Sequence, residues 1–437
     1  MSRRIVITCL GSYGDVFPYI GLARALQTRG HQPLVATSAS YRAAVEQEGI
    51  DFAPLGPDVD LRDEAGLARV MDARRGGEVV VKEFVIPALE QMYEETSRLA
   101  ERADVLVSHP LTFATPAVAT ARAMPWVGTI LAPLSLFSDA DFPVLPALPG
   151  MAPAIRAWPW LRRTLMRLVR GETAKWAAPL AALRARHGLP PAGNPLMEGQ
   201  YSPLLNLALY SRVMAEPQAD WPPFMRVTGF VFYNGPGALP PELDTFLAAG
   251  PPPIVFTLGS SAVGAAGRFY HESAEAAARL GARAVLLTGG FAANRPARVP
   301  DGVLLVDRAP HQLLFPRARA VVHQGGAGTT AQALRAGCPM LVVPHSHDQP
   351  DNAFRVTRLG VARTLYPKRY TAARAATELE RLLGDPSYAA RAREAAVIVV
   401  AEGGAEAAAD AIASVALPAS ARSAQIADRA TVSGKPA

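Results

Sequence analysis

The fold is decided by one stretch in the second half of the chain: His323-Gln324-Gly325-Gly326-Ala327-Gly328-Thr329-Thr330. An apolar run precedes it at residues 319–322, and a helix-forming segment follows it and ends at Gly337. This order predicts a buried strand, a glycine loop and a helix. Glycines let the backbone approach a pyrophosphate, and the N–H groups and positive dipole at the start of a helix attract its charge. The stretch therefore predicts a diphosphate-binding loop.

The motifs around this loop make the sequence recognisable. The glycine spacing is neither G-x-G-x-x-G nor that of a lysine-bearing P-loop, which disfavours dinucleotide binding and nucleotide hydrolysis. Ala-Gly-Cys-Pro follows at residues 336–339, and Pro-x-x-x-Asp-Gln-Pro-x-Asn at residues 344–352. Together these motifs resemble the donor signature of nucleotide-sugar-dependent glycosyltransferases with the GT-B fold. Residues 11–416 resemble two groups of them most, the rhamnolipid-type rhamnosyltransferases and the sterol, macrolide and glycopeptide glycosyltransferases.

The resemblance implies an α/β protein with two Rossmann-like, doubly wound domains facing each other across a cleft. Composition agrees, because 437 residues that are 50% hydrophobic exceed one typical domain. We expect five segments: an acceptor-binding domain at 1–215, a linker at 216–228, a domain for the sugar nucleotide at 229–400, a helix crossing back to the N-terminal domain at 401–417, and a disordered tail at 418–437.

Net charge and cysteine content indicate which binding partners and which cellular compartment to expect. The net charge of +6 comes without a long basic block or interleaved aromatic residues, so we expect no nucleic-acid binding. Cys9 and Cys338 fall in apolar segments and predict reduced thiols. With no signal peptide and no apolar run of membrane-spanning length, we expect a cytoplasmic monomer or homodimer, at most peripheral at the inner membrane.

Asp15 is the candidate catalytic base. It follows the predicted strand at residues 5–10 and stands in Gly-Ser-Tyr-Gly-Asp-Val-Phe-Pro, residues 11–18. Capping of the next helix is an alternative role. The sterol and glycopeptide glycosyltransferases share Gly-x-x-Gly-Asp-Val-x-Pro, and the resemblance implies that Asp15 is the proposed general base, where plant relatives have histidine. A positioned carboxylate can take the proton of an acceptor hydroxyl, and burial should raise its pKa.

The resemblance also assigns the residues that hold the sugar nucleotide. His323, together with the loop amides and the helix dipole, is expected to stabilise the leaving diphosphate in place of a metal ion. Asp348 and Gln349 are expected to bind the sugar hydroxyls. Arg308 replaces a tryptophan of the plant relatives, which leaves uridine and thymidine both open. The expected set also contains Gly14, Gly259, Ser260, Ser261, His311, Gly325, Gly326, Ala327, Gly328 and Thr329.

The acceptor is expected to lie against the N-terminal half. Residues 132–159 are rich in proline and apolar side chains, and the resemblance places part of the acceptor pocket there. His109, after the predicted strand at residues 105–107, contacts either the substrate or Asp15, or has a structural role. The candidate acceptor-binding residues are Tyr13, His109, Phe137, Phe142 and Leu145.

Three further patterns suggest a metal site or a membrane contact, and each also has a simpler interpretation. Asp139-Ala140-Asp141 has the Asp-x-Asp form of metal-dependent glycosyltransferases, but these belong to another fold, and we expect two solvated aspartates. His345, His347 and Asp348 lack further ligands at suitable spacing, so we expect no metal and no cofactor besides the sugar nucleotide. Residues 156–176 predict a basic amphipathic helix that covers the N-terminal domain or, as the alternative, docks on an anionic membrane.

The sequence thus predicts an inverting glycosyltransferase. It would transfer rhamnose or glucose from a dTDP- or UDP-sugar to a hydroxyl of a hydrophobic small molecule: a hydroxyacyl lipid, sterol, polyketide or flavonoid. Two alternatives remain open at this point: a sugar-nucleotide epimerase or hydrolase of the same fold, and a non-catalytic subunit that binds sugar nucleotides and stabilises a partner transferase.

Overall fold

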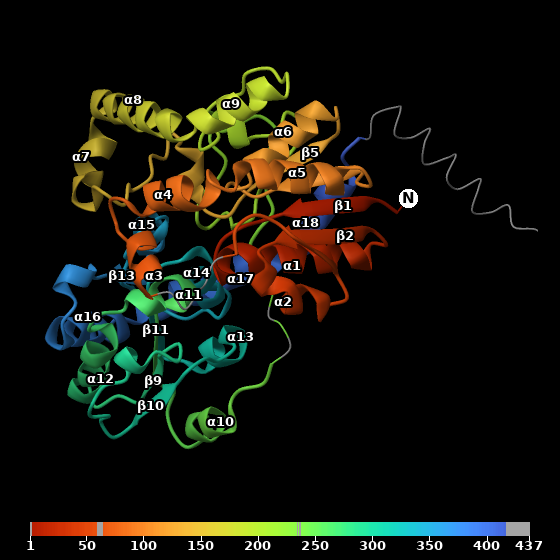
Figure 1. Cartoon of the computed structure of the whole chain (residues 1–437). Helices are drawn as coiled ribbons and strands as arrows, with labels where there is room; N and C mark the ends of the chain where they lie inside the picture. The colour runs from red at the N-terminus through yellow and green to blue at the C-terminus, as the bar shows by residue number, and fades with distance from the viewer. Residues whose placement is uncertain (1, 59–63, 234, 236, 417–437) are drawn as a thin grey trace, which may run out of the picture.

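The computed structural model describes residues 2–58, 64–233, 235 and 237–416, and these form two α/β domains (Figure 1). Within the described residues, the first sheet has seven parallel strands in the order β3-β2-β1-β4-β5-β6-β7, and the second has six in the order β10-β9-β8-β11-β12-β13. Both strand orders reverse direction at their first strand, as in doubly wound sheets. The predicted fold class is confirmed.

The strands are short and mostly buried, as expected for parallel sheets covered on both faces. Those of the first sheet are β1 (Arg4–Thr8), β2 (Gln32–Thr37), β3 (Asp51–Pro54), β4 (Val105–Ser108), β5 (Trp126–Ile130), β6 (Asn206–Ala208) and β7 (Met225–Val227). Those of the second are β8 (Ile254–Thr257), β9 (Ala284–Leu287), β10 (Val303–Val306), β11 (Ala320–His323), β12 (Met340–Val342) and β13 (Ala362–Thr364).

Helices alternate with the strands and cover both faces of each sheet (Figure 1). The N-terminal domain contains α1 (Tyr13–Thr28), α2 (Arg42–Glu46), α3 (Glu64–Val70), α4 (Gly76–Val79), α5 (Leu89–Ala100), α6 (Ala114–Ala121), α7 (Ala152–Ala157), α8 (Pro159–Trp176) and α9 (Ala178–Arg186), with shorter turns that include η2 (Val80–Val85) and η3 (Pro133–Leu136). The second half contains α10 (Pro241–Ala248), α11 (Gly259–Ala262), η6 (Val263–Ala265), α12 (Phe269–Arg279), α13 (His311–Leu314), α14 (Ala327–Arg335), α15 (Gln349–Arg358), α16 (Ala372–Gly384), α17 (Pro386–Ala401) and α18 (Gly404–Ala413).

Alternate residues along each central strand fill opposite cores. In β1, Ile5 and Ile7 pack with α1 on one face of the sheet, whereas Val6 packs with α5 on the other. In β8, Phe256 and Val255 likewise belong to different cores. This side-chain period of two fixes the pairing of the strands, because a shift of one residue would expose the apolar set.

The domain boundaries differ in one place from those expected. Residues 216–228 were expected to form a linker, but β7 lies within that range and pairs in parallel with β6, from Asn206 opposite Met225 to Ala208 opposite Val227. The first sheet therefore extends further than its sequence suggests, because a three-residue strand among prolines carries little pattern. The tail at 418–437 lies outside the described residues.

The last helix returns to the N-terminal domain. α18 packs against α1, and its Ala408, Ala409 and Ile412 join the core that contains Leu22 and Leu26 (Figure 1). The first and the last of the described elements, β1 and α18, thus lie in the same domain.

Candidate functional site

A cleft of about 1830 Å³ runs between the two domains. It lies at the carboxyl ends of the parallel strands, where doubly wound sheets bind ligands. The N-terminal domain contributes Tyr13, Gly14, Asp15, His109, Phe137 and Leu145 to its lining, and the C-terminal domain contributes Gly259, Ser260, Ser261, Arg308, His311, Gly326, Ala327, Gly328, Thr329, Asp348 and Gln349. The structure therefore brings most of the predicted residues together on one cavity.

Asp15 lies in the first turn of α1 with one carboxylate oxygen occupied and one facing the cleft. Its Oδ2 accepts hydrogen bonds from the backbone N–H of Ser12 at 2.8 Å and from the Ser12 hydroxyl at 3.1 Å. The side chain is 38% exposed. Burial raises the pKa of Asp15, while the two hydrogen bonds from Ser12 and water in the cleft oppose that rise. Both roles considered for Asp15 are compatible, since it caps the helix and lines the cleft.

His109 follows β4 and directs its ring toward Asp15. Its Nδ1 accepts the N–H of Leu111 at 3.1 Å, which leaves the proton of the neutral ring on Nε2. Nε2 lies 3.9 Å from Oδ1 of Asp15. Burial lowers the pKa of His109 to about 3, so the ring is neutral at physiological pH. His109 is therefore an N–H donor beside Asp15 and no proton acceptor in this arrangement.

A network of buried hydroxyls supports the strand ends beneath these two residues. The Thr8 hydroxyl lies 3.0 Å from that of Thr112 and 2.8 Å from that of Thr115. Tyr19 and Thr129 share a hydrogen bond of 2.6 Å, and the Tyr19 ring packs edge-on against His109. The sequence does not reveal this network, because its members come from different elements and carry no common motif.

The glycine loop after β11 has the geometry expected of a phosphate cradle. Gly325 has a φ of +87°, and a Cβ on it would lie 2.8 Å from Cγ1 of Val342. Gly326 is the N-cap of α14, and Asn352 donates to the carbonyl of Gly325 at 2.9 Å. The first amides of α14 face the cleft without a capping side chain, which leaves them available to an anion.

His323 lies beneath this loop and not on the cleft surface. Its ring is fully buried, and Nδ1 accepts the N–H of Gly325 at 3.0 Å. Nε2 has no hydrogen-bond partner among the described residues. Burial, with a further contribution from the neighbouring His311, lowers the pKa of His323 to about 3. The ring is therefore neutral and shapes the loop.

The turn before α15 carries the residues expected to bind the sugar. Oδ2 of Asp348 accepts from the Asn352 amide at 2.7 Å. Burial, and then the charge of Asp15, raise the pKa of Asp348 to about 7, so two carboxylates from opposite domains influence each other across the cleft. Oε1 of Gln349 accepts the N–H groups of His345 and Ser346, which fixes the turn.

Arg308 and His311, which were expected to bind the base, both line the cleft. The guanidinium of Arg308 lies 5.9 Å from the centre of the Tyr13 ring, on the other side of the cleft. The His311 ring stacks on Phe315 at 4.4 Å, and burial lowers the pKa of His311 to about 4. A neutral ring and a cation thus flank this part of the cleft.

The part of the cleft expected to hold the acceptor is lined by apolar side chains, but Phe142 is not among them. Phe137 and Leu145 line the cleft, and so do Val169 and Trp176 of α8. Phe142, expected in the acceptor pocket, instead packs in a small core with Leu145 and the inner face of α8, because the loop folds back beneath that helix. The apolar face of α8 therefore covers the N-terminal domain.

Only one of the two aspartates in the Asp-x-Asp pattern is solvated as expected. Asp139 is 52% exposed and pairs with Arg162 at 2.9 Å, whereas Asp141 is 12% exposed and pairs with Arg156 at 2.9 Å and with Arg355. Guanidinium groups occupy both carboxylates, because the fold brings arginines from other elements against this loop. Among the described residues, no cluster of three or more histidine, cysteine, aspartate or glutamate side chains is arranged to hold a metal.

The end of α3 and the segment that follows it contact the C-terminal domain. The sequence does not indicate this contact. Ser346 donates to the carbonyl of Asp72 at 2.9 Å, and Nε2 of His347 lies 2.9 Å from the carbonyl of Val70. Met71 packs in the core of the C-terminal domain. These contacts hold the turn before Asp348, and no local pattern signals them because their partners lie more than 250 positions apart.

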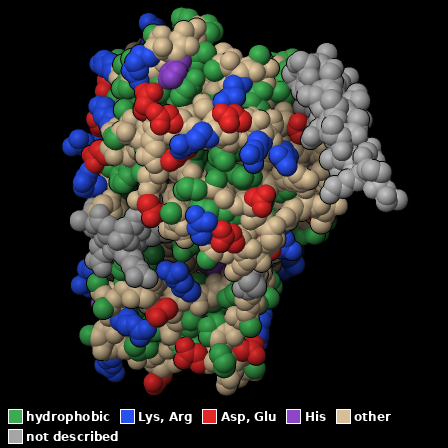
Figure 2. All heavy atoms as spheres, turned by 45° about the vertical axis from the view of Figure 1, so that its right-hand side comes forward, with side chains coloured by type: hydrophobic (Ala, Val, Ile, Leu, Met, Phe, Trp, Pro, Cys, Tyr) green, Lys and Arg blue, Asp and Glu red, His purple; other side chains and the backbone are tan. Residues whose placement is uncertain are grey.

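Figure 2 shows one face of the molecule, on which basic and acidic side chains are interspersed outside its grey atoms.

Comparison with known proteins decides the family. The chain matches the glycosyltransferase family 28 N-terminal domain over residues 5–119 and the erythromycin biosynthesis protein CIII-like C-terminal domain over residues 274–414. It is 34% identical to O-mycaminosyltylonolide 6-deoxyallosyltransferase of Streptomyces fradiae over 414 residues, which cover 92% of this chain and 95% of that enzyme. The chain belongs to this glycosyltransferase family. It is a nucleotide-sugar-dependent enzyme of the UDP/dTDP-glycosyltransferase superfamily.

Other relatives agree with this assignment. The glycosyltransferase is 28% identical to sterol 3-beta-glucosyltransferase of Arabidopsis thaliana over 431 residues, which cover 93% of this chain and 67% of that one. Spinosyn rhamnosyltransferase SpnG complexed with thymidine diphosphate has the same fold, with a TM-score of 0.64 at 21% identity over 91% of this chain and 96% of that one. The predicted resemblance to macrolide and sterol glycosyltransferases is confirmed, as is the GT-B fold.

Part of the surface of the glycosyltransferase around α8 is apolar. Trp158, the N-cap of α8, and Trp160 and Leu168 on the helix are exposed, with Trp160 64% exposed. Among the described helices, none combines the length and apolar character needed to cross a bilayer.

Proposed function

We propose that this glycosyltransferase transfers a sugar with inversion from a nucleoside diphosphate to a hydroxyl of a large, apolar small molecule, with Asp15 as the base. One observation carries the proposal: Asp15 on α1 and the free amides at the start of α14 face the same cleft from opposite domains. A base and an anion cradle on either side of one cavity suit a displacement in which proton and leaving group depart in opposite directions.

The proton goes to the cleft-facing oxygen of Asp15. Because Ser12 occupies Oδ2, Oδ1 is the oxygen that accepts the acceptor's hydroxyl proton as the oxygen attacks the anomeric carbon. The bond between that carbon and the diphosphate oxygen breaks on the opposite face, which inverts the configuration. The raised pKa makes Asp15 a stronger base than an exposed aspartate.

The leaving diphosphate is stabilised by fixed dipoles, and we propose that no metal ion takes part. The amides of Gly328 and Thr329 and the positive end of α14 supply the compensating charge. His323 acts from beneath the loop. Its unpartnered Nε2 is the buried polar atom that a phosphate oxygen would satisfy after a small shift of the loop.

We propose a dTDP-activated 6-deoxyhexose, such as rhamnose, as the favoured sugar, and UDP-glucose as the alternative. The S. fradiae relative is named for a 6-deoxyallosyl transfer and is more similar to this chain than the sterol glucosyltransferase. A spinosyn rhamnosyltransferase of the same fold binds thymidine diphosphate. With a pKa of about 7, Asp348 can donate as well as accept hydrogen bonds to such a sugar, and so can the amide of Gln349.

We propose a polyketide or sterol-sized acceptor. Pockets for one drug-sized ligand occupy roughly 300–1000 Å³, whereas this cleft measures about 1830 Å³ and has room for two large substrates. The apolar lining by Phe137, Leu145, Val169 and Trp176 suits a ring system with few polar groups. A hydroxyacyl lipid and a flavonoid remain acceptors to be tested.

We also propose that α8 makes superficial contact with anionic membranes, from which an apolar acceptor can be drawn. Its exposed Trp160 and Leu168 stand beside Arg163 and Arg167, a combination that favours the bilayer interface. Co-sedimentation with vesicles of phosphatidylcholine alone or with phosphatidylglycerol tests this, and equal recovery from both would contradict it.

The decisive experiment is product analysis by mass spectrometry. Wild type and Asp15→Asn are incubated with dTDP-rhamnose or UDP-glucose and a panel of macrolide aglycones, sterols, hydroxyacyl lipids and flavonoids. A glycoside from the wild type, lost by a factor of about 10²–10⁴ in the variant while the nucleotide still binds, supports the proposal. Sugar release without acceptor favours hydrolysis, and nucleotide binding without any product favours a non-catalytic subunit.

A further inference from the structure

One helix of the C-terminal domain contacts both sides of the cleft. α15 begins directly after Asp348, and its Asn352 holds the Asp348 carboxylate at 2.7 Å and the carbonyl of Gly325 at 2.9 Å. The start of α15 is therefore bound to the glycine loop and to the turn assigned to the sugar. Any displacement of α15 moves both.

The next turns of the same helix hold the loop that lines the acceptor side. Oδ1 of Asp351 accepts the N–H of Val144 at 2.9 Å, and its Oδ2 pairs with Arg355 at 2.7 Å. Arg355 also pairs with Asp141 and donates to the carbonyl of Met214 at 3.1 Å. Val144 and Asp141 belong to residues 131–146, called here the acceptor loop, which carries Phe137 and Leu145 into the cleft.

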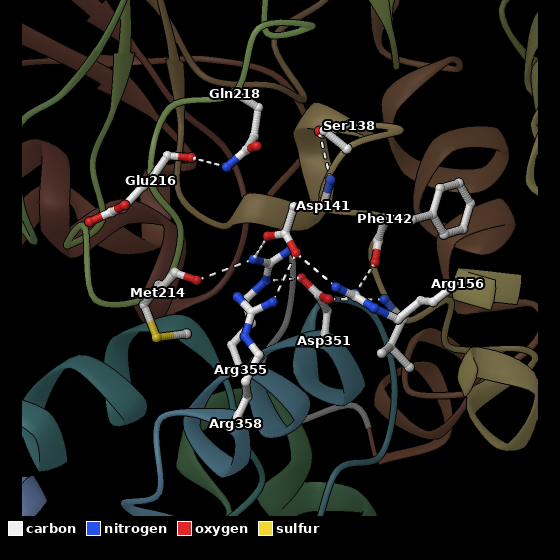
Figure 3. Close-up of polar contacts among 12 residues, drawn as sticks. Ser138, Asp141, Phe142, Arg156, Met214, Glu216, Gln218, Asp351, Arg355 and Arg358 are labelled. Atoms are coloured by element: carbon white, nitrogen blue, oxygen red, sulfur yellow. Dashed lines mark hydrogen bonds and ion pairs between the residues drawn. The ribbon is translucent and has the colours of Figure 1, made fainter. Parts of the chain in front are cut away.

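The centre of the ion cluster between helix and loop is shielded from water, whereas Arg358 lies at its exposed edge. Figure 3 shows the Asp141 carboxylate between Arg355, Arg358 and Arg156, with Asp351 beside Arg355. The side chain of Arg355 is 2% exposed and that of Asp351 0%. Although burial opposes its ionisation, the three guanidinium groups keep the pKa of Asp141 well below its usual range. A buried ion cluster adds little net stability compared with apolar packing, but it permits few alternative geometries.

We propose that Asp141, Asp351 and Arg355 are positioning residues that join the acceptor loop to α15, so that an acceptor bound beside Phe137 and Leu145 sets the position of Asp348 and Gln349 on the sugar. This rests on the proposed function. The two substrates then bind cooperatively, because each needs the same docked arrangement of loop and helix. Without an acceptor the docked arrangement is less populated, so water hydrolyses the bound sugar nucleotide more slowly.

The test compares Asp141→Asn and Arg355→Gln with two matched controls. Asp139→Asn removes a neighbouring aspartate that pairs only within the N-terminal domain, and Arg358→Gln removes a partner of Asp141 that is 47% exposed. Calorimetry gives the dissociation constant of the dTDP- or UDP-sugar with and without acceptor. In the wild type, the acceptor should tighten binding about 5- to 150-fold. Asp141→Asn and Arg355→Gln should abolish that factor and lower kcat about tenfold or more, Arg358→Gln should have a smaller effect, and Asp139→Asn none.

Thermal unfolding of every variant separates this role from loss of folding, and Asp141→Glu should restore part of the cooperativity. If Asp141→Asn lowers the melting temperature but retains the cooperativity and kcat of Asp139→Asn, the proposal is wrong.

Hydrogen–deuterium exchange of the wild type keeps the proposal testable if no glycoside forms. Binding of the sugar nucleotide alone should slow exchange in residues 131–146, and Asp141→Asn should lose that protection. Absence of product with protection would overturn only the proposed function, whereas product without protection would overturn only the coupling.

Discussion

Gly328 and Gly14 face each other across the cleft, and a Cβ placed on Gly328 would lie 3.7 Å from the Cα of Gly14. The starts of α14 and α1 are therefore in close contact at this pair of glycines. Both helices direct their positive ends at the space between Asp15 and the glycine loop, where the diphosphate charge is expected. The absence of side chains at both positions keeps that space open.

Gly328→Leu should therefore separate the two helix ends and lower kcat/KM about a hundredfold. A leucine side chain extends well beyond the 3.7 Å available, whereas the single methyl group of Gly328→Ala makes an ordinary contact. Steady-state kinetics on both variants, with melting temperatures as a folding control, measures the difference. Equal activity of the leucine and alanine variants would show that the helix ends need not approach during turnover.

The N–H of His109 should affect the pH at which kcat/KM falls as Asp15 becomes protonated. Asp15 must be ionised to accept a proton, so kcat/KM should fall on acidification through a pKa above that of an ordinary aspartate. His109→Phe keeps the ring volume but removes a donor 3.9 Å from Oδ1. Loss of a donor disfavours the carboxylate, so the midpoint should move to higher pH by less than about one unit. A shift to lower pH in the pH–rate profile would contradict this arrangement.

Gly325→Ala should destabilise the fold and weaken nucleotide binding together. Its φ of +87° is strained for alanine, at a cost of about 1–3 kcal/mol, and the added methyl group would lie 2.8 Å from Val342. Thermal unfolding and titration with dTDP measure the two effects. Gly384→Ala, at the end of α16 with open space around it, is the control and should change neither. If Gly325→Ala is destabilised but binds dTDP with normal affinity, the loop does not take part in nucleotide binding.

Asp348→Asn should stabilise the protein above neutral pH. The pKa of Asp348 is about 7 in the fold against 3.8 for the ordinary side chain. The unfolded chain therefore binds fewer protons than the folded one between these values, and stability is lost as pH rises from about 4 to 7. Asparagine removes this loss, so the gain in melting temperature should be larger at about pH 8 than at about pH 5. Asp139→Asn is the opposite case, since Arg162 lowers the pKa of Asp139, and it should lose stability at about pH 8.

The strand, glycine loop and helix expected to bind the donor were predictable from sequence because their determinants are local. The strand, the glycines and the start of α14 are consecutive in the chain, so one window of sequence contains the whole cradle. Asp15 is similarly local, as it follows β1 directly and caps α1. The Asp351–Arg355 spacing of four residues on α15 was a further local signal, since such pairs meet on one helix face.

The rest of the site depends on contacts that no window contains. Asp141 lies 214 positions from its partner Arg355, so its Asp-x-Asp neighbourhood suggested solvated carboxylates. Phe142 was placed in the pocket because its segment is apolar, yet the fold turns it into a small core under α8. His323 matched a motif, but the motif alone does not reveal that the ring lies beneath the loop.

The return of α18 to the first domain affects how this enzyme can be recombined with its relatives. Ala408 and Ile412 complete a core that also contains Leu22 and Leu26 of α1. A chimera that exchanges only the first half for that of another glycosyltransferase would join two surfaces that did not evolve together. Domain exchange intended to change acceptor choice should therefore take residues 402–416 from the same parent as the N-terminal half.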